Sequence, residues 1–187
     1  MKRIVLSAIA LSALCIVPFL HSQTQNSSNA ASEPPLPSMP STEEINDLLS
    51  KASEYAAEYR MTFKNAKPTL DKTPTPGFVE KSDELCSQAN AIIAAIKKNG
   101  PTAYALVTLV GVLDDMSLNG ARASAMSMIV ALQQGAPEAN RHALEDVQDL
   151  AQVEKNCYDI SELILHSTLR LIAVEEQVLH VLTDQKK

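Results

Sequence analysis

The sequence predicts an all-α protein: an up-and-down helical bundle of about five helices that ends in a long C-terminal helix. Hydrophobic residues make up 45% of the chain, and the alternation of Val, Thr and Tyr that is typical of sheets is scarce. Apolar residues instead recur at steps of three and four, which places them on one side of a helix. From Glu138 to Thr183 the chain contains no Gly and no Pro, so nothing in that segment interrupts a helix.

Residues 1–22 are predicted to be a signal peptide. The basic start Met1-Lys2-Arg3 precedes an apolar run from Ile4 to Leu20, and Ser22 provides a small residue for cleavage before Gln23. This order of a basic region, an apolar region and a small residue is typical of secretory signals. We therefore expect an exported protein, periplasmic or secreted.

Two alternatives to a cleaved signal are open. A lipoprotein signal fits less well, because Leu14 stands where a small residue would precede the modified Cys15. A retained anchor is the other alternative, since this region of 17 residues lies at the short edge of membrane-spanning length. Cleavage would remove Lys2 and Arg3 and no acid, so the formal charge would change from −6 to −8. An acidic chain without a basic cluster disfavours nucleic acid and anionic membrane surfaces as partners. No stable membrane insertion is expected after the signal is cleaved.

Residues 23–40 are predicted to be a disordered linker, because their Asn, Ser, Ala and Pro bury too little apolar surface to offset the entropy of ordering them. The helical-bundle domain is assigned to residues 41–187. Ser41 and Glu44 form the S-x-x-E pattern of a capping box. The first helix is therefore expected from Thr42 to Lys67.

An aromatic row on this helix, Tyr55, Tyr59 and Phe63, could be a stacking platform for a ligand, but such rows are more often core. The three prolines in the segment from Lys67 to Gly77 predict a loop. The apolar series that follows predicts a second helix from Val79 to Lys98.

The next apolar segment, from Thr102 to Met116, contains β-branched residues that would also suit a strand. No other segment offers a partner strand, so a helix is favoured. Because it is apolar on nearly every side, we expect it at the centre of the bundle. Asn119-Gly120 is expected to end it, and a further short helix is expected from Ala121 to Gln134.

The long helix begins at Pro137, where a fixed φ is favourable and an N–H is not needed. At 1.5 Å per residue it would extend for roughly 70 Å, well beyond the others. Either it kinks near Asn156, or its end projects beyond the bundle. In the second case, an exposed apolar row would form an interaction surface, made of Leu171, Val174, Val178 and Leu182.

Cys86 and Cys157 remain after the predicted cleavage, and both lie on apolar faces. Because exported proteins meet an oxidising environment, a disulfide between them is the favoured interpretation. Two buried free thiols are the alternative. A catalytic thiol is disfavoured, since no histidine lies close in sequence.

Each mature histidine follows a glutamate by four residues, as in Glu162/His166 and Glu176/His180. Their face of the helix is polar throughout, and these two histidines would lie roughly 21 Å apart along it, so no metal site and no cofactor are predicted. Asp114-Asp115 is interpreted as serving a turn or cap rather than catalysis.

No nucleophile motif, phosphate-binding loop or covalent haem motif is present in the sequence. The sequence therefore predicts an exported, non-enzymatic protein that acts through an unknown protein partner or as a homo-oligomer. The alternative is a bundle that binds a small apolar ligand, or a non-covalent haem held by Met61 or Met116 and a histidine.

Overall fold

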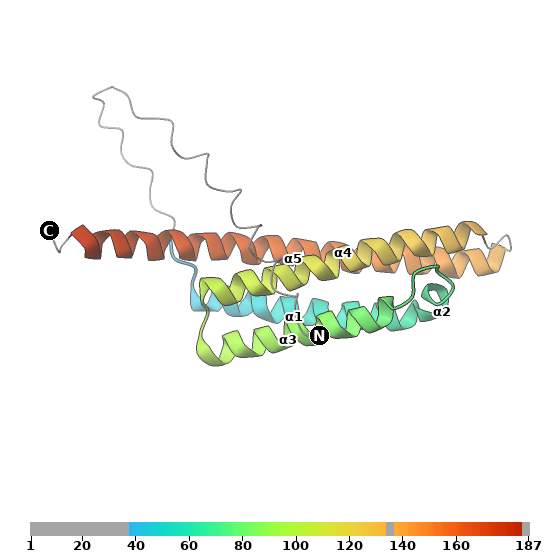
Figure 1. The fold of residues 1–187 in the computed structure, drawn as a ribbon, viewed down its shortest axis with the longest axis horizontal. Coiled ribbons are helices and arrows are strands. Elements are labelled where there is room, and N and C mark those ends of the chain that lie inside the picture. The colour runs from blue at the N-terminus through green and yellow to red at the C-terminus, as the bar shows by residue number, and fades with distance from the viewer. Residues whose placement is uncertain (1–37, 134–136, 185–187) are drawn as a thin grey trace, which may run out of the picture. The chain divides into compact units, whose positions relative to one another are not determined.

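A computed structural model of the chain describes residues 38–133 and 137–184. Their helices are α1 (Thr42–Asn65), α2 (Lys67–Leu70), α3 (Phe78–Asn99), α4 (Ala103–Gln133) and α5 (Pro137–Asp184). The four long helices form a ring in which each packs against the next in the chain, and α5 closes the ring against α1 (Figure 1). The all-α, up-and-down bundle with a long C-terminal helix is therefore confirmed.

Polar pairs between neighbouring helices show that they run antiparallel. Between α1 and α3, Arg60 pairs with Asp83 and Ser53 donates to Asn90, so one number rises as the other falls. Between α4 and α5, Ser124 donates to the Val147 carbonyl and Asp114 accepts from Ser161, so these numbers also run in opposite directions. Three residues separate α3 from α4 and α4 from α5, and so short a connection favours antiparallel neighbours, whereas α1 and α3 are joined by a longer segment that includes α2.

The aromatic row of α1 packs into the core, as expected, although Tyr55 is only partly buried. Tyr59 and Phe63 are fully buried, with their ring centroids 4.5 Å apart. The Tyr59 hydroxyl donates to the Met116 carbonyl of α4 at 2.9 Å and accepts from the Asn119 amide at the same distance. Because both roles of the hydroxyl are satisfied, its burial leaves no unpaired polar group.

The start of α1 is also as predicted. The Ser41 side chain accepts a hydrogen bond from the Glu44 backbone N–H, which is the N-cap half of the capping box. The predicted loop from Lys67 to Gly77 is only partly a loop, because its first four residues form the short helix α2. Pro68 lies in the first turn of α2, where the lack of an N–H costs nothing.

The predicted break at Asn119-Gly120 is wrong, because α4 continues through it as one helix. Gly120 lies against α5, where a Cβ would stand 2.9 Å from the Glu154 Cβ and 3.2 Å from its Cα. The glycine therefore permits a close helix–helix approach instead of ending the helix. Asp114-Asp115 consequently lies inside a helix and serves no turn.

The expectation that the first half of α4 lies at the centre of the bundle is wrong as well. Tyr104 and Val107 are 83% and 48% exposed. The helix packs against α3 and α5 and leaves its outer side uncovered by the described residues. The first half of α4 therefore carries apolar residues on nearly every side, but it is buried on only part of its circumference.

The long helix α5 runs unbroken through Asn156, so no kink folds its second half back. The side chain of Asn156 accepts from Gln152 and donates to Glu58 of α1, on the helix surface. Figure 1 shows the C-terminal end of α5 extending past the ends of α1 and α4. Of the two arrangements that the sequence allowed, the projecting end is the one adopted.

The predicted signal peptide, residues 1–22, and most of the predicted linker lie outside the described residues. The linker's last residues are described, and they contact the bundle. Pro40 is buried, and Ser38 accepts hydrogen bonds from Arg170 of α5 at its carbonyl (3.0 Å) and its hydroxyl (3.3 Å). The contact with the bundle therefore begins before residue 41.

Candidate interaction surface on helix α5

The row predicted as an interaction surface divides into a buried and an exposed part. Leu171 is 4% exposed and belongs to the core, and Val174 is half-buried. Val178 and Leu182 are 54% and 53% exposed. Because these residues recur on one side of the helix, the row leaves the core gradually as α5 passes the end of the bundle.

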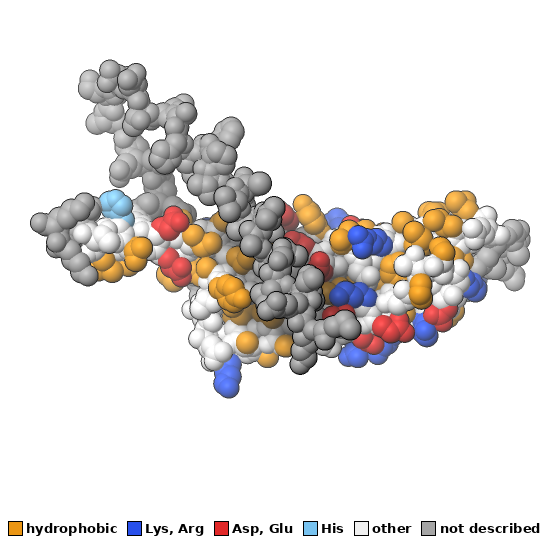
Figure 2. Space-filling view, viewed as in Figure 1, with side chains coloured by type: hydrophobic (Ala, Val, Ile, Leu, Met, Phe, Trp, Pro, Cys, Tyr) orange, Lys and Arg blue, Asp and Glu red, His pale blue; other side chains and the backbone are white. Residues whose placement is uncertain are grey.

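Sequence reasoning missed one member of this surface, Leu179, which is 66% exposed. It lies next to Val178 and lengthens the apolar edge, so we define the α5 end surface as Val178, Leu179 and Leu182. Figure 2 shows hydrophobic side chains along one edge of this projecting segment. The signal that could have found Leu179 is the run Val178-Leu179, in which adjacent apolar residues widen the stripe.

A polar cluster fixes the point where α5 leaves the bundle. The Arg170 guanidinium pairs with the Glu44 carboxylate at 2.6 Å, and the Ser167 hydroxyl donates to the same carboxylate oxygen at 3.3 Å. Together with the hydrogen bonds to Ser38, these contacts hold α5 against the start of α1. The surface beyond therefore projects from an anchored helix instead of from a frayed end.

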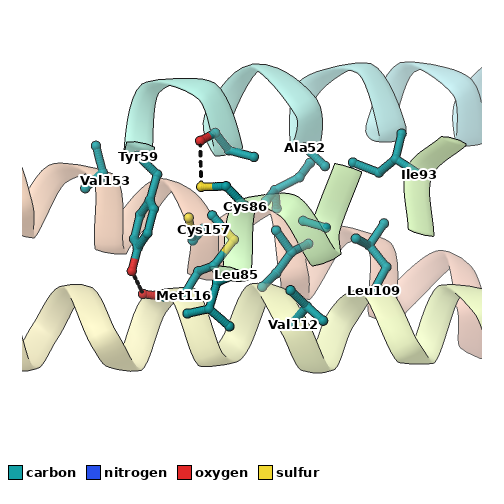
Figure 3. Close-up of a cluster of buried hydrophobic side chains, with 14 of the residues drawn as sticks. Ala52, Tyr59, Leu85, Cys86, Ile93, Leu109, Val112, Met116, Val153 and Cys157 are labelled. Carbon is teal, nitrogen blue, oxygen red and sulfur yellow. Dashed lines mark hydrogen bonds between the residues drawn. The ribbon is translucent and has the colours of Figure 1, made fainter. Parts of the chain in front are cut away.

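Cys86 and Cys157 are both buried free thiols in this structure. They lie close together in the core, between α3 and α5 (Figure 3). The Cys86 thiol donates to the Ala56 carbonyl at 3.1 Å. Burial raises the pKa of Cys86 to about 11 and that of Cys157 to about 12, and the nearby Cys86 adds to the second shift. Neutral thiols of this kind are poor nucleophiles.

The histidines do not assemble a metal site from the described residues, among which no group of three metal-binding side chains occurs. His142 pairs with Glu145, three residues later, at 3.2 Å. The Glu138 side chain, its predicted partner, lies outside the described residues. His166 is exposed on the polar face of α5.

Other candidate residues are dispersed. Met61 is 56% exposed, whereas Met116 is fully buried. Asp114 accepts a hydrogen bond from Ser161 of α5, which gives it a packing role between helices. Surface hollows of about 190 and 370 Å³ lie beside Phe78, and one of about 480 Å³ lies beside Glu44 and Leu48. All three are open to solvent, whereas ligand sites usually enclose most of the ligand's surface.

Comparisons with known proteins do not assign the chain to a family. No family model, no curated protein and no solved structure matches the chain. Among the described helices, none combines the length and the apolar character needed to cross a membrane.

Proposed function

We propose that this chain is an exported, non-enzymatic helical-bundle protein that acts through protein–protein interaction or self-association. The α5 end surface is its contact site. The observation that supports the proposal is the exposure of Val178, Leu179 and Leu182, between 53% and 66%, on a helix that extends past its neighbours. The free energy falls when a partner covers such apolar groups and removes them from water.

Three further features agree with a contact role. The anchor at Arg170 and Glu44 holds the projecting helix in a fixed direction, which lowers the entropy lost on binding. An α-helix with an apolar row is a common element of recognition, because a groove or a second helix can cover it. The acidic charge of the chain disfavours nucleic acid as the partner.

The proposal is tested by photo-crosslinking in the native host. A crosslinking amino acid is placed at Val178 or Leu182, and the matched control carries it at Leu163. Leu163 lies on the same helix and is 51% exposed, but it lies on the bundle and not on the end surface. We expect crosslinked products from the end surface and not from the control. Equal labelling at all three positions, or at none, would contradict the proposal.

We also propose that export joins Cys86 to Cys157 in a disulfide. Their neighbouring positions in the core support this, since the Cys86 thiol contributes to the raised pKa of Cys157 (Figure 3). Closing a loop of this length would stabilise the fold by roughly 4 kcal/mol in the chain-entropy model. Peptide mapping of exported, unreduced protein should find the two linked. Free thiols in oxidised, folded protein would contradict it.

A further inference from the structure

A second apolar row lies on α4, on the side turned away from the rest of the bundle. Its exposed fractions are 83% for Tyr104, 48% for Val107, 49% for Leu118, 40% for Ile129 and 77% for Leu132. Gly111, Arg122 and Ala125 are exposed as well, and Asp114 completes the row at its edge toward α5, where it is exposed but accepts a hydrogen bond from Ser161. We call these nine residues the α4 stripe. At 100° per residue, all lie within about 40° of one line along the helix.

The bundle does not account for this row. The sides of α4 that pack on α3 and α5 carry other residues, such as Met116 and Gly120. Tyr104 and Leu132 lie 28 residues apart, and the stripe covers this distance in eight steps, an average of 3.5 residues. That average is the repeat of a coiled-coil seam, which twists to keep its apolar residues against a second helix.

Gly111 gives an independent sign of a missing neighbour. A Cβ at this position would meet no atom within 4 Å, so packing inside the chain does not require glycine. Glycine within a helix is less favourable than alanine, because it loses more backbone entropy on folding. The close approach of a helix from another molecule would explain it, as Glu154 explains Gly120 on the opposite side.

The stripe is symmetric about Leu118. Steps of four, seven, eleven and fourteen residues in both directions lead to pairs of like character or opposite charge. These pairs are Asp114 with Arg122, which have opposite charges, Gly111 with Ala125, which are both small, Val107 with Ile129, which are both β-branched, and Tyr104 with Leu132, which are both large and hydrophobic but differ in size. An interface across a two-fold axis needs this property, because residue i then contacts residue j while j contacts i.

Charge fixes the direction of such a pairing. Antiparallel helices centred on Leu118 would place Asp114 beside Arg122 of the second copy, twice. Parallel helices would instead place Asp114 beside Asp114 and Arg122 beside Arg122, which is unfavourable. Within the described part of the chain, Arg122 forms no ion pair of its own.

We propose that two copies of this chain associate through antiparallel packing of their α4 stripes about a two-fold axis at Leu118. The small residues Gly111 and Ala125 would face each other there and allow the two backbones to approach closely. The inference rests on the proposed function, because it names a second copy as a partner. It uses a different surface from the α5 end, so the two can be tested separately.

The first experiment uses Gly111→Leu, with sedimentation velocity of the host-processed protein at several concentrations. Inside the chain the new side chain meets open space, so we expect the fold to be retained and thermal stability to be no lower. Between two stripes it would force the helices apart. The wild type should sediment as a dimer whose dissociation constant rises by a factor of about ten or more in the variant.

The second experiment exchanges charges. Arg122→Asp alone and Asp114→Arg alone each place like charges across the interface, and each should weaken the dimer by about tenfold to 100-fold. An equimolar mixture of the two variants restores opposite charges at both sites, so a mixed dimer should form. The Asp114→Arg, Arg122→Asp double variant should also dimerise with itself. Circular dichroism checks that Asp114→Arg remains folded despite losing its contact with Ser161.

A monomeric wild type at high concentration would overturn the inference. So would a dimer that Gly111→Leu and Arg122→Asp leave intact but Val178→Glu/Leu182→Glu dissociates. That second result would move the contact to α5 and leave the proposed function standing. A dimer lost in the stripe variants, retained in the α5 variant and recovered in the mixture would support the α4 stripe.

Discussion

The two halves of α5 carry the same spacing of apolar residues and meet opposite environments. Leu150, Ile160 and Ile164 are at most 1% exposed, because α1 and α4 cover this half. Val178 and Leu182 continue the spacing and are more than half exposed. Periodicity therefore defines the side of a helix that avoids water, but the neighbouring elements decide whether that side is core or a contact surface.

The largest effect is expected in the covered half. Ile160→Ala removes a fully buried side chain between packed helices, and the cavity that it leaves cannot be filled by water. We expect a loss of about 2–5 kcal/mol in the free energy of unfolding. Urea denaturation measures it, and a loss below about 1 kcal/mol would show that this half is loosely packed.

Gly111 and Gly120 of α4 allow the same comparison, because Gly120 lies on a side covered by α5 and Gly111 lies on an uncovered side. Gly120→Ala should cost about 1–3 kcal/mol, because its Cβ would meet the backbone and Cβ of Glu154. Gly111→Ala should stabilise the monomer by about 0.5–1 kcal/mol, since it gains helix propensity and meets nothing. Thermal unfolding at low concentration measures both, and shifts of equal sign would contradict the assigned environments.

The buried thiols predict a pH dependence of the reduced protein. Because burial raises the pKa of Cys86 to about 11 and that of Cys157 to about 12 from the ordinary 9.0, the unfolded chain releases these protons at lower pH than the folded chain. Stability from this source is complete below pH 9 and is lost as the pH rises toward 12.

Urea denaturation across this pH range compares reduced wild type with Cys86→Ala/Cys157→Ala. The variant has no thiols to titrate, so its stability should fall less steeply with pH, whatever other groups contribute. Parallel slopes in the two proteins would show that the thiols are not buried as described. A disulfide-linked sample should also lack this dependence.

The anchor of the projecting end should contribute a smaller amount. Arg170→Ala removes the pair with Glu44 and the hydrogen bonds to Ser38, at a site that is partly exposed. Because solvent screens such contacts, we expect a loss of about 0.5–1 kcal/mol. Thermal unfolding checks it against Lys155→Ala, whose pair with Asp159 lies on one exposed face of α5 and should matter less.

Local signals predicted the elements well. The capping pattern at Ser41, the end of the second helix at Lys98 and the start at Pro137 depend on residues close in sequence, and each agrees with the observed bounds to within one residue. The prediction was wrong at Gly120, because the reason for that glycine is Glu154 on another helix. A single sequence does not reveal such a contact.

The candidate surfaces were only partly predictable for the same reason. The apolar row of α5 was visible, but its division between Leu171 and Val178 depends on where α1 and α4 end. The α4 stripe was missed, because hydrophobicity on every side was interpreted as a central position. Its symmetry about Leu118 is present in the sequence, yet it gains meaning only once these residues are known to share the outer side.

The central claim is that the α5 end surface lies outside the intramolecular core. Urea denaturation of Val178→Glu/Leu182→Glu tests it most directly, in monomeric protein at low concentration. We expect a free energy of unfolding within about 0.5 kcal/mol of wild type, as for exposed positions elsewhere. A loss comparable to that of Ile160→Ala would show that these side chains pack within the bundle, and the α5 end would then offer no contact surface.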